Sequence, residues 1–191
     1  IDVSVVDQSA AKAFDGSITV SALASSQTIE FSGFSSKTAA VNKGTINIDF
    51  GAWSGDTFTT NTDKTSQSLV VSESNNTLSG LADSLRAISG VNATVTDKGD
   101  GTFSLIINSD TGLKNALRLR VTEDNSDSGL ASFDTSSNNA SKQVVSAQDA
   151  SLTINGVQVT RASNTVTDLI DGYQFKLNST TSAAASVIAS N

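Results

Sequence analysis

Short runs of alternating apolar and polar residues dominate the chain and predict a β-rich protein. Such alternation places every second side chain on the same face of a strand. The predicted strands cover residues 17–20, 28–31, 44–50, 57–60, 68–72, 91–96, 103–107, 117–121, 152–154, 157–159 and 173–177. The strand at 68–72 holds three consecutive apolar residues, which indicate burial on both faces. Residues 51–56, around Trp53, are expected to form a turn.

One amphipathic helix is predicted at residues 78–89. Its apolar stripe recurs at a spacing of three and four residues and consists of Leu78, Leu81, Leu85 and Ile88. Thr77 or Asn76 can cap the first turn, and Gly90 stands where a left-handed residue commonly ends a helix. Both ends of this helix therefore have a physical reason.

Turn sequences predict how the later strands connect. Residues 97–101 contain Asp-Lys-Gly-Asp-Gly and indicate a hairpin, and Asn155-Gly156 is a strong signal for a two-residue turn. The strand at 117–121 turns Arg118 and Arg120 away from its apolar face. Residues 164–170 are expected to form a capped turn or a short helix.

Two polar stretches, 35–43 and 134–142, lack an apolar period and are candidate domain boundaries. We therefore expect a discontinuous β-rich domain of residues 1–42 plus 142–191. A second β-rich domain of residues 43–141, with the short helix near 78–89, is inserted in it. The predicted fold class is mainly β, or β-rich α+β, with two small domains.

Composition excludes several kinds of chemistry. The 191 residues include no His, Cys, Met or Pro, which removes disulfides, thiolate or imidazole metal ligands and histidine acid–base catalysis. The net charge is -7 and the 12 basic residues are scattered, so nucleic acid is not an expected partner. Apolar runs are too short to cross a membrane. Because the chain does not begin with Met, we expect an internal piece of a longer protein.

Two acidic groups offer the oxygen ligands that Ca²⁺ prefers: Asp97, Asp100 and Asp110, and Glu123, Asp124 and Asp127. Neither group has the EF-hand spacing, and turn chemistry explains both. No phosphate-binding glycine motif occurs. We assign no catalytic, cofactor-binding or metal-binding residue and expect no cofactor, although a distant carboxylate pair for glycoside hydrolysis stays open.

Four Asn-x-Ser/Thr sequons occur, at Asn75, Asn92, Asn139 and Asn178, in a chain rich in these residue types. They therefore carry little weight. The single Trp and single Tyr make a carbohydrate cleft a weak expectation, and Trp53 is expected to pack in a loop or to form an exposed contact.

Two stretches of the chain contain distinctive sequence motifs. Residues 16–29, followed by Phe34, contain a strand that ends in Leu23-Ala24, with Gln27 after it. Residues 147–172 contain Ile-Asn-Gly-Val and then Ser-Asn-Thr-Val-Thr-Asp-Leu-Ile-Asp-Gly. Both stretches resemble the flagellar filament cap protein family, also called hook-associated protein FliD, and residues 44–121 resemble the variable region of the same family more weakly.

The resemblance implies a secreted, extracellular, non-enzymatic protein at the tip of the bacterial flagellum. The chain would be the head of the cap, without the terminal coiled-coil segments of the family. The implied partners are flagellin, whose polymerisation the cap promotes, and further copies of the protein in a homo-oligomeric ring. Host mucin or glycans are additional partners to consider.

Two other functions stay open. One is an extracellular adhesin or carbohydrate-binding module, and the other is the outer domain of flagellin or of a hook–filament junction protein. The early Leu-Ala and Gln residues favour the cap. An enzyme is the least favoured class, because the residue types it needs are missing or not organised.

Overall fold

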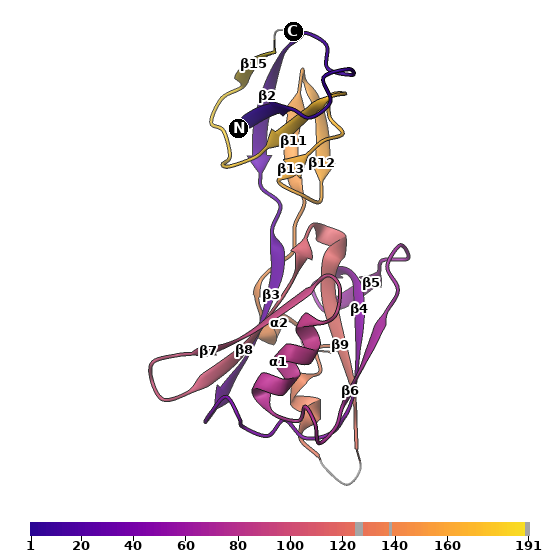
Figure 1. The fold of residues 1–191 in the computed structure, drawn as a ribbon, viewed down its shortest axis with the longest axis vertical. Coiled ribbons are helices and arrows are strands. Elements are labelled where there is room, and N and C mark those ends of the chain that lie inside the picture. The colour runs from indigo at the N-terminus through magenta and orange to yellow at the C-terminus, as the bar shows by residue number, and fades with distance from the viewer. Residues whose placement is uncertain (125–127, 138, 190–191) are drawn as a thin grey trace. The chain divides into compact units, whose positions relative to one another are not determined.

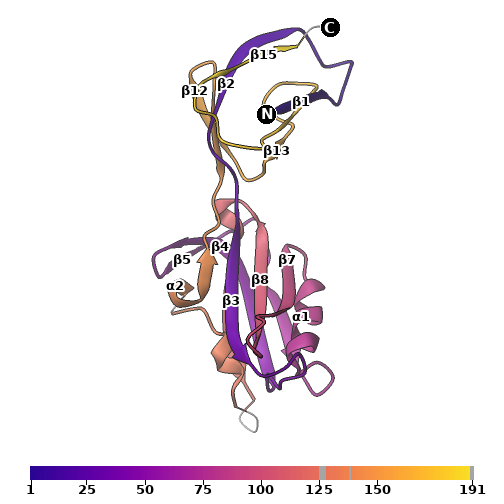
Figure 2. The ribbon, with the colours of Figure 1, turned by 90° about the vertical axis from the view of Figure 1, so that its left-hand side faces the viewer.

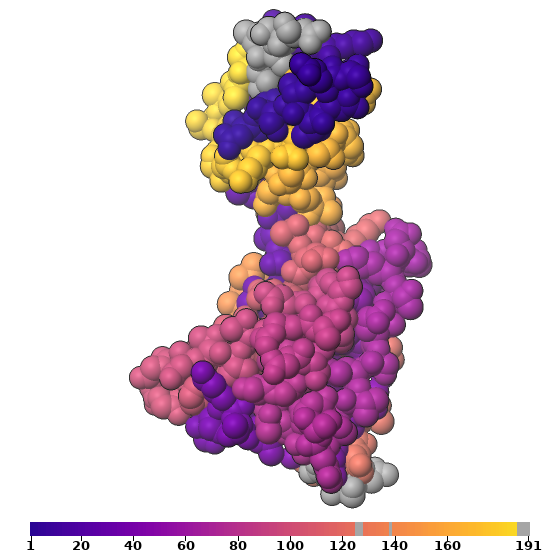
Figure 3. Space-filling model, in the orientation of Figure 1, coloured from indigo at the N-terminus to yellow at the C-terminus, as the bar shows by residue number. Residues whose placement is uncertain are grey.

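A computed structural model describes residues 1–124, 128–137 and 139–189. The chain forms two compact units (Figures 1 and 2). Unit 1 comprises residues 1–25, 111–113 and 148–191, and unit 2 comprises residues 26–110 and 114–147. The beginning and the end of the chain thus share one unit, where indigo and yellow atoms gather in Figure 3.

The units divide at different residues from those that the sequence suggested. The divisions fall after Ser25 and Ala147, whereas the polar stretches pointed to 42 and 141. The reason is strand β3 (Ser26–Phe34), which pairs with β10 (Gln143–Val145) and with a strand from the middle of the chain. Its side chains enter the core of unit 2, so residues 35–43 connect two elements within that unit.

Unit 1 consists of two small antiparallel sheets. The first has the order β12-β11-β2-β15, with β12 (Val157–Arg161), β11 (Ala150–Ile154), β2 (Phe14–Ala22) and β15 (Ala185–Ala189). The second has the order β1-β14-β13, with β1 (Asp2–Val5), β14 (Tyr173–Lys176) and β13 (Thr165–Val166). A common core includes Ile18, Val20, Leu152, Tyr173 and Phe175.

The hairpin predicted from Asn155-Gly156 is confirmed. Ile154 pairs with Val157 across a two-residue turn in which Asn155 and Gly156 have φ of 48° and 85°. Both residue types tolerate this left-handed backbone, and such turns match the twist of the paired strands. Residues 164–170 form the short strand β13 and bends, where a capped turn or helix was expected.

Unit 2 is built from two sheets and a helix. The first sheet has the order β10-β3-β8-β7, with β8 (Phe103–Thr111) and β7 (Val91–Asp97). In the second, β4 (Gly44–Ser54) is central and pairs with β9 (Ala116–Glu123) on one edge and with β5 (Thr57–Thr60) and β6 (Gln67–Val71) on the other. Short helical segments are Leu113–Asn115, Leu130–Phe133 and α2 (Asn139–Lys142).

The predicted helix is present as α1 (Leu78–Arg86), which ends three residues earlier than expected. The side chain of Thr77 accepts a hydrogen bond from Gly80 N at 3.1 Å, and Gly90 has a φ of 83°. The leucine stripe packs into one core with both sheets, which includes Ile29, Phe31, Ile46, Ile48, Leu105, Ile107, Leu117, Leu119 and Phe133. The predicted mainly β class is confirmed.

Three local expectations are wrong. Trp53 lies within β4, which continues to Ser54 before the chain turns. Val70 was expected to be buried but is 63% exposed, because it lies on the face of its sheet that is turned away from the core. Thr135 and Asn139 lie in a stretch read as a polar linker, yet both are buried. Among the described residues, no helix has the length and apolar character needed to span a membrane.

Candidate functional site: the outer face of the β4 sheet

The central sheet of unit 2 has one face in the core and one face turned outward. Ile46, Ile48 and Phe50 of β4 point into the core, so the alternate residues of β4 lie on the opposite face. We call this the outer face. The strand register places on it Thr45, Asn47, Asp49 and Trp53 of β4, Phe58 of β5, Ser68 and Val70 of β6, and Arg118, Arg120 and Thr122 of β9.

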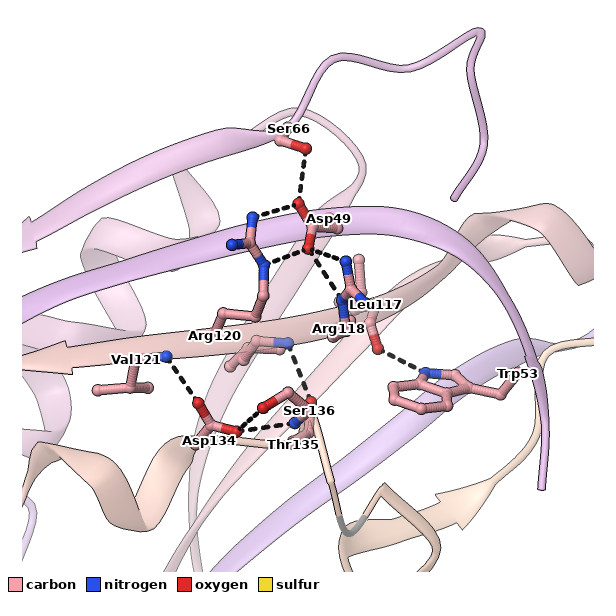
Figure 4. A network of polar contacts seen from close by, with 11 residues as sticks. Asp49, Trp53, Ser66, Leu117, Arg118, Arg120, Val121, Asp134, Thr135 and Ser136 are labelled. Carbon is pink, nitrogen blue, oxygen red and sulfur yellow. Dashed lines mark hydrogen bonds and ion pairs between the residues drawn. The ribbon is translucent and has the colours of Figure 1, made fainter. Parts of the chain in front are cut away.

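A carboxylate bound by two arginines occupies the middle of the outer face (Figure 4). Oδ2 of Asp49 accepts hydrogen bonds from Nε of Arg120 at 2.7 Å and from Nε of Arg118 at 3.0 Å. Its Oδ1 accepts from Nη2 of Arg120 at 3.0 Å and from Oγ of Ser66 at 2.6 Å. Asp49 is 2% exposed, whereas the side chain of Arg120 is 48% exposed. The carboxylate is therefore fully used, and the face presents guanidinium groups to solvent.

The two arginines hold Asp49 in its charged form. Burial raises the pKa of this carboxyl. Hydrogen bonds from Arg120, Ser66 and Arg118 and the charge of Arg120 lower the pKa by more than burial raises it. The net pKa lies well below its ordinary value. The pKa of Asp49 is thus lower in the folded than in the unfolded protein, where it is about 3.9. The ionised network therefore stabilises the fold above about pH 3.9, and this stabilisation is lost as the pH falls from there toward the folded-state pKa.

We expect Asp49→Asn to lower the free energy of unfolding of unit 2 by about 2 to 3 kcal/mol at pH 7, since two arginines lose their negative partner and one of its acceptor oxygens. At pH 3 the deficit should shrink by about 1 kcal/mol, because the wild-type protein has lost part of the contribution there. Urea unfolding followed by the emission of Trp53, the single tryptophan, measures it.

Asp56→Asn is the matched control, since Asp56 is exposed in the turn after β4. It should change the unfolding free energy by less than about 0.5 kcal/mol. If Asp49→Asn lowered the free energy of unfolding by the same amount at pH 7 and pH 3, the ionised network would not be the source of the stabilisation.

Aromatic side chains lie at one end of the outer face. The rings of Trp53 and Phe58 meet edge to face with 4.8 Å between centroids, and the guanidinium of Arg118 lies 4.6 Å from the centre of the Phe58 ring. The indole Nε1 donates to the carbonyl oxygen of Leu117 at 2.9 Å. Trp and Arg are enriched where proteins contact one another. This chain places its single Trp and two of its four Arg together here.

A shallow groove lies at the other end of the outer face. Its volume is about 390 Å³, and Lys43, Thr45, Val70, Ser72 and Thr122 contribute to its lining. Among the large apolar residues whose exposure the structure describes, Val70 has the largest exposed fraction, 63%. Arginine, aromatic and apolar groups in one row suit the outer face to binding another protein surface.

Side chains close the free edge of β9 beside this face. Three backbone N–H groups, those of Leu117, Leu119 and Val121, donate to Gln27 Oε1 at 2.7 Å, Thr135 Oγ1 at 2.9 Å and Asp134 Oδ2 at 2.8 Å. Unpaired N–H groups at an edge would otherwise invite another strand. This explains why the polar stretch at 134–142 holds buried residues, which sequence reasoning missed.

The acidic groups considered for Ca²⁺ serve local structure. Asp97 and Asp100 accept hydrogen bonds from Gly99 N and Thr102 N two residues further on, and Asp110 pairs with Lys64 at 3.4 Å. Glu123 accepts from the backbone of Ala131 at 2.8 Å, and Asp127 lies outside the described residues. Within the described ranges, no three acidic residues are grouped as metal ligands.

Other candidate residues are occupied as well. Ser9 and Lys12 have the Ser-x-x-Lys spacing of a lysine-activated nucleophile, but the Ser9 hydroxyl donates to Asp7 Oδ1 at 2.6 Å and lies at the surface. Asn139, one of the sequon residues, is 1% exposed and accepts a hydrogen bond from Gln27 Nε2 at 3.0 Å. Neither arrangement supplies a reactive group.

The residues that carry the family resemblance hold unit 1 together. The side chain of Asn164 accepts from Ala24 N at 2.7 Å and donates to Ala24 O at 2.8 Å, which joins the two resembling stretches. Oδ1 of Asn155 accepts from Ser17 N at 2.9 Å. Asp168 pairs with Arg161 at 2.8 Å. The shared sequence features thus specify how distant segments meet.

Comparison with known proteins identifies relatives that match parts of the chain. Residues 147–190 match the family model described as flagellar hook-associated protein 2 C-terminus. The flagellar hook-associated protein 2 of Escherichia coli K12 is 38% identical over 109 residues, which cover 56% of this chain and 23% of that protein. The B-type protein of Pseudomonas aeruginosa PAO1 is 28% identical over 158 residues, 76% of this chain and 31% of its own length.

Solved structures extend the similarity to the full chain. The D1-D2-D3 domains of the flagellar cap protein FliD from E. coli superpose with a TM-score of 0.79 at 30% identity, covering 100% of this chain and 56% of that one. The D2-D3 domains alone give a TM-score of 0.78 at 28% identity and cover 94% of that chain. The matched part of the chain thus covers only 23% of the E. coli K12 protein, and the whole chain is similar in structure to the D2-D3 domains of E. coli FliD.

Proposed function

We propose that this chain, a FliD-family protein over its two head domains, forms the head of a flagellar filament cap. The observation that carries the proposal is the similarity to FliD D2-D3 domains over all 191 residues, at a TM-score of 0.78. Asn155, Asn164 and Gln27 of the two resembling stretches support it, because they make the contacts that join distant segments.

In this role the protein is secreted and lies at the distal end of the filament. Its partners are flagellin, whose polymerisation it promotes, and neighbouring copies in a homo-oligomeric ring. The outer face is the surface that we assign to such contacts, because its arginine and aromatic groups are typical of interface cores. The division into an inserted unit 2 and a discontinuous unit 1 belongs to the same proposal.

The role is structural and does not require catalysis. An adhesin with a sugar-binding aromatic platform has less support, since Arg118 lies over the ring of Phe58 and the Trp53 Nε1 donor is already bonded. We therefore keep host mucin and glycans out of the proposed partners.

A chimeric cap protein tests the proposal. In the E. coli protein, the D2-D3 domains are replaced by residues 1–191, and the chimera is expressed in a cap-deficient strain. We expect filament growth and swimming to return and secreted flagellin monomer in the medium to fall. An exported, folded chimera that leaves flagellin leaking at the level of the empty strain would contradict the proposal.

A second version of the chimera removes unit 2, together with residues 111–113 of unit 1, and leaves the other strands of unit 1 whole. Ser25 and Gln148 form an antiparallel bridge, with Ser25 N to Gln148 O at 2.9 Å and Gln148 N to Ser25 O at 3.1 Å. Replacing residues 26–147 by Asn-Gly should close this bridge as a hairpin. Comparing the two chimeras shows which unit filament growth needs.

A further inference from the structure

We propose that the free edge of β7, beside helix α1, binds an extended acidic segment of a partner protein by strand addition. The feature lies in unit 2 and is separate from the outer face. β7 is the last strand in the order β10-β3-β8-β7, so one of its two edges has no strand beside it (Figure 2). The structure shows which backbone groups this edge presents.

The hydrogen-bonding pattern along β7, in which alternate residues bond to β8, identifies those groups. The pairing with β8 is regular, and Lys98 N donates to Thr102 O at 3.0 Å at the end of the hairpin, so even-numbered residues face β8. Odd-numbered residues face away. Val91 N donates to Ile88 O at 3.1 Å, and Ala93 O accepts from Arg86 Nη1 at 2.9 Å. Both observations agree with this parity.

Val95 continues the outward-facing series. In the part of the chain that the structure describes, its N–H and C=O have no hydrogen-bond partner, and they point away from β8. The edge of β9 is treated differently, since Gln27, Thr135 and Asp134 cap its N–H groups. The edge of β7 is thus open at Val95, beyond the bonded N–H of Val91 and C=O of Ala93, and an open strand edge is a template for another strand.

A hollow beside Val95 gives the added strand a place for a side chain. Its volume is about 180 Å³, and its lining includes Lys37, Ser79, Ala82 and Arg86. The guanidinium of Arg86 is paired with Asp83, whereas Lys37 has no ion-pair partner among the described residues. The hollow therefore carries an uncompensated positive charge.

Charge complementarity selects the occupant. The added strand takes up the N–H and C=O of Val95 in its backbone and places a carboxylate toward the ammonium of Lys37. Hydroxyls of Ser79 and Thr94 at the hollow suit a polar side chain at the same point. The partner is thus an extended segment with Asp or Glu between β-branched residues.

A short peptide tests this inference on the intact chain. The probe is acetyl-Thr-Val-Asp-Val-Thr-amide, and its matched control replaces the Asp by Asn. Amide resonances of ¹⁵N-labelled protein are followed during titration. We expect shifts and slowed hydrogen exchange at Val95 and Asp97, with the Asn peptide binding about two- to fivefold more weakly.

Two variants separate the charge from the backbone contact. Lys37→Gln should lower the affinity for the Asp peptide by the same two- to fivefold and abolish the difference in affinity between the two peptides. Lys114→Gln, which changes an exposed lysine, should leave both affinities unchanged. Val95→Pro removes the outward N–H without touching the ladder to β8 and should weaken both peptides at least about tenfold.

Three results would overturn the inference. They are unchanged Val95 and Asp97 signals at saturating peptide, equal affinity for the Asp and Asn peptides, and no effect of Lys37→Gln. Protection of Val95 that grows with protein concentration alone would assign the edge to a second copy and exclude the acidic partner strand.

Discussion

Replacing Gly172 by alanine is expected to destabilise unit 1 by about 3 to 5 kcal/mol. Gly172 has a φ of 83°, which side chains rarely adopt. A Cβ there would lie 2.4 Å from Ala11 N and 2.6 Å from Asp7 O, and these backbone atoms cannot move aside as a flexible side chain would. Its carbonyl also accepts from Val6 N at 2.9 Å, so the segment before β2 lies directly on this glycine.

Gly156→Ala is the matched control. Gly156 has nearly the same φ, 85°, but nothing lies within 4 Å of its added Cβ. Gly156→Ala should lower the free energy of unfolding by about 1 kcal/mol, which is the penalty of the left-handed backbone alone. Urea unfolding followed by the emission of Tyr173, the single tyrosine and a core residue of unit 1, measures both variants. Equal costs at the two glycines would contradict the close approach at Gly172.

Gln27→Leu is expected to destabilise unit 2 by about 3 kcal/mol. Gln27 is fully buried. Its Oε1 accepts from Leu117 N at 2.7 Å, and its Nε2 donates to Asn139 Oδ1 at 3.0 Å and to Gln143 Oε1 at 2.9 Å. Leucine fills the space but removes the partner of Leu117 N and of Asn139 Oδ1, and a buried unpaired polar group costs about 1 to 3 kcal/mol.

Gln27→Glu distinguishes hydrogen bonding from packing. The carboxylate would face the oxygens of Asn139 and Gln143, so its folded-state pKa should be raised. The variant should therefore lose stability as the pH rises from about 4.3 toward that raised pKa and recover it as the pH falls. The readout is Trp53 emission during urea unfolding, with the exposed Gln67→Leu as control. A Gln27→Glu variant as stable as wild type at pH 7 would show that the amide network is dispensable.

Both residues belong to the stretches that resemble the cap protein family. Gly172 closes the stretch at 147–172, and Gln27 belongs to the stretch at 16–29. Neither lies on the outer face. The residues that resemble the cap family thus support the framework, and the outer face proposed for partner contacts lies elsewhere in the fold.

Local features of the fold could be predicted from the sequence. The hairpin at Asn155-Gly156 and the cap at Thr77 depend on neighbouring residues alone, and both are present. The outward position of Arg118 and Arg120 followed from alternation along β9. Their partner Asp49 lies about 70 residues away, and alternation says nothing about which strand will lie alongside.

Long-range pairing explains the other differences. β3 was assigned to the first domain because a polar stretch follows it, but its partners β8 and β10 lie far along the chain. Strand β1 was not predicted, although Asp2–Val5 alternates polar and apolar residues; its strand partner β14 lies at the far end of the chain. Thr135 and Asn139 resemble linker residues in the sequence. Thr135 bonds to a strand edge and Asn139 to a buried amide, and both tasks use the small polar residue types that are also common in loops.

The location of the protein on the flagellum tests the central claim most directly. Antibodies against residues 1–191, with gold label, can be applied to cells that produce the full-length protein and examined by electron microscopy. The account predicts label at the distal tip of each filament. Label along the filament would assign the chain to flagellin, and label at the hook junction would assign it to a junction protein; either result would contradict the cap function.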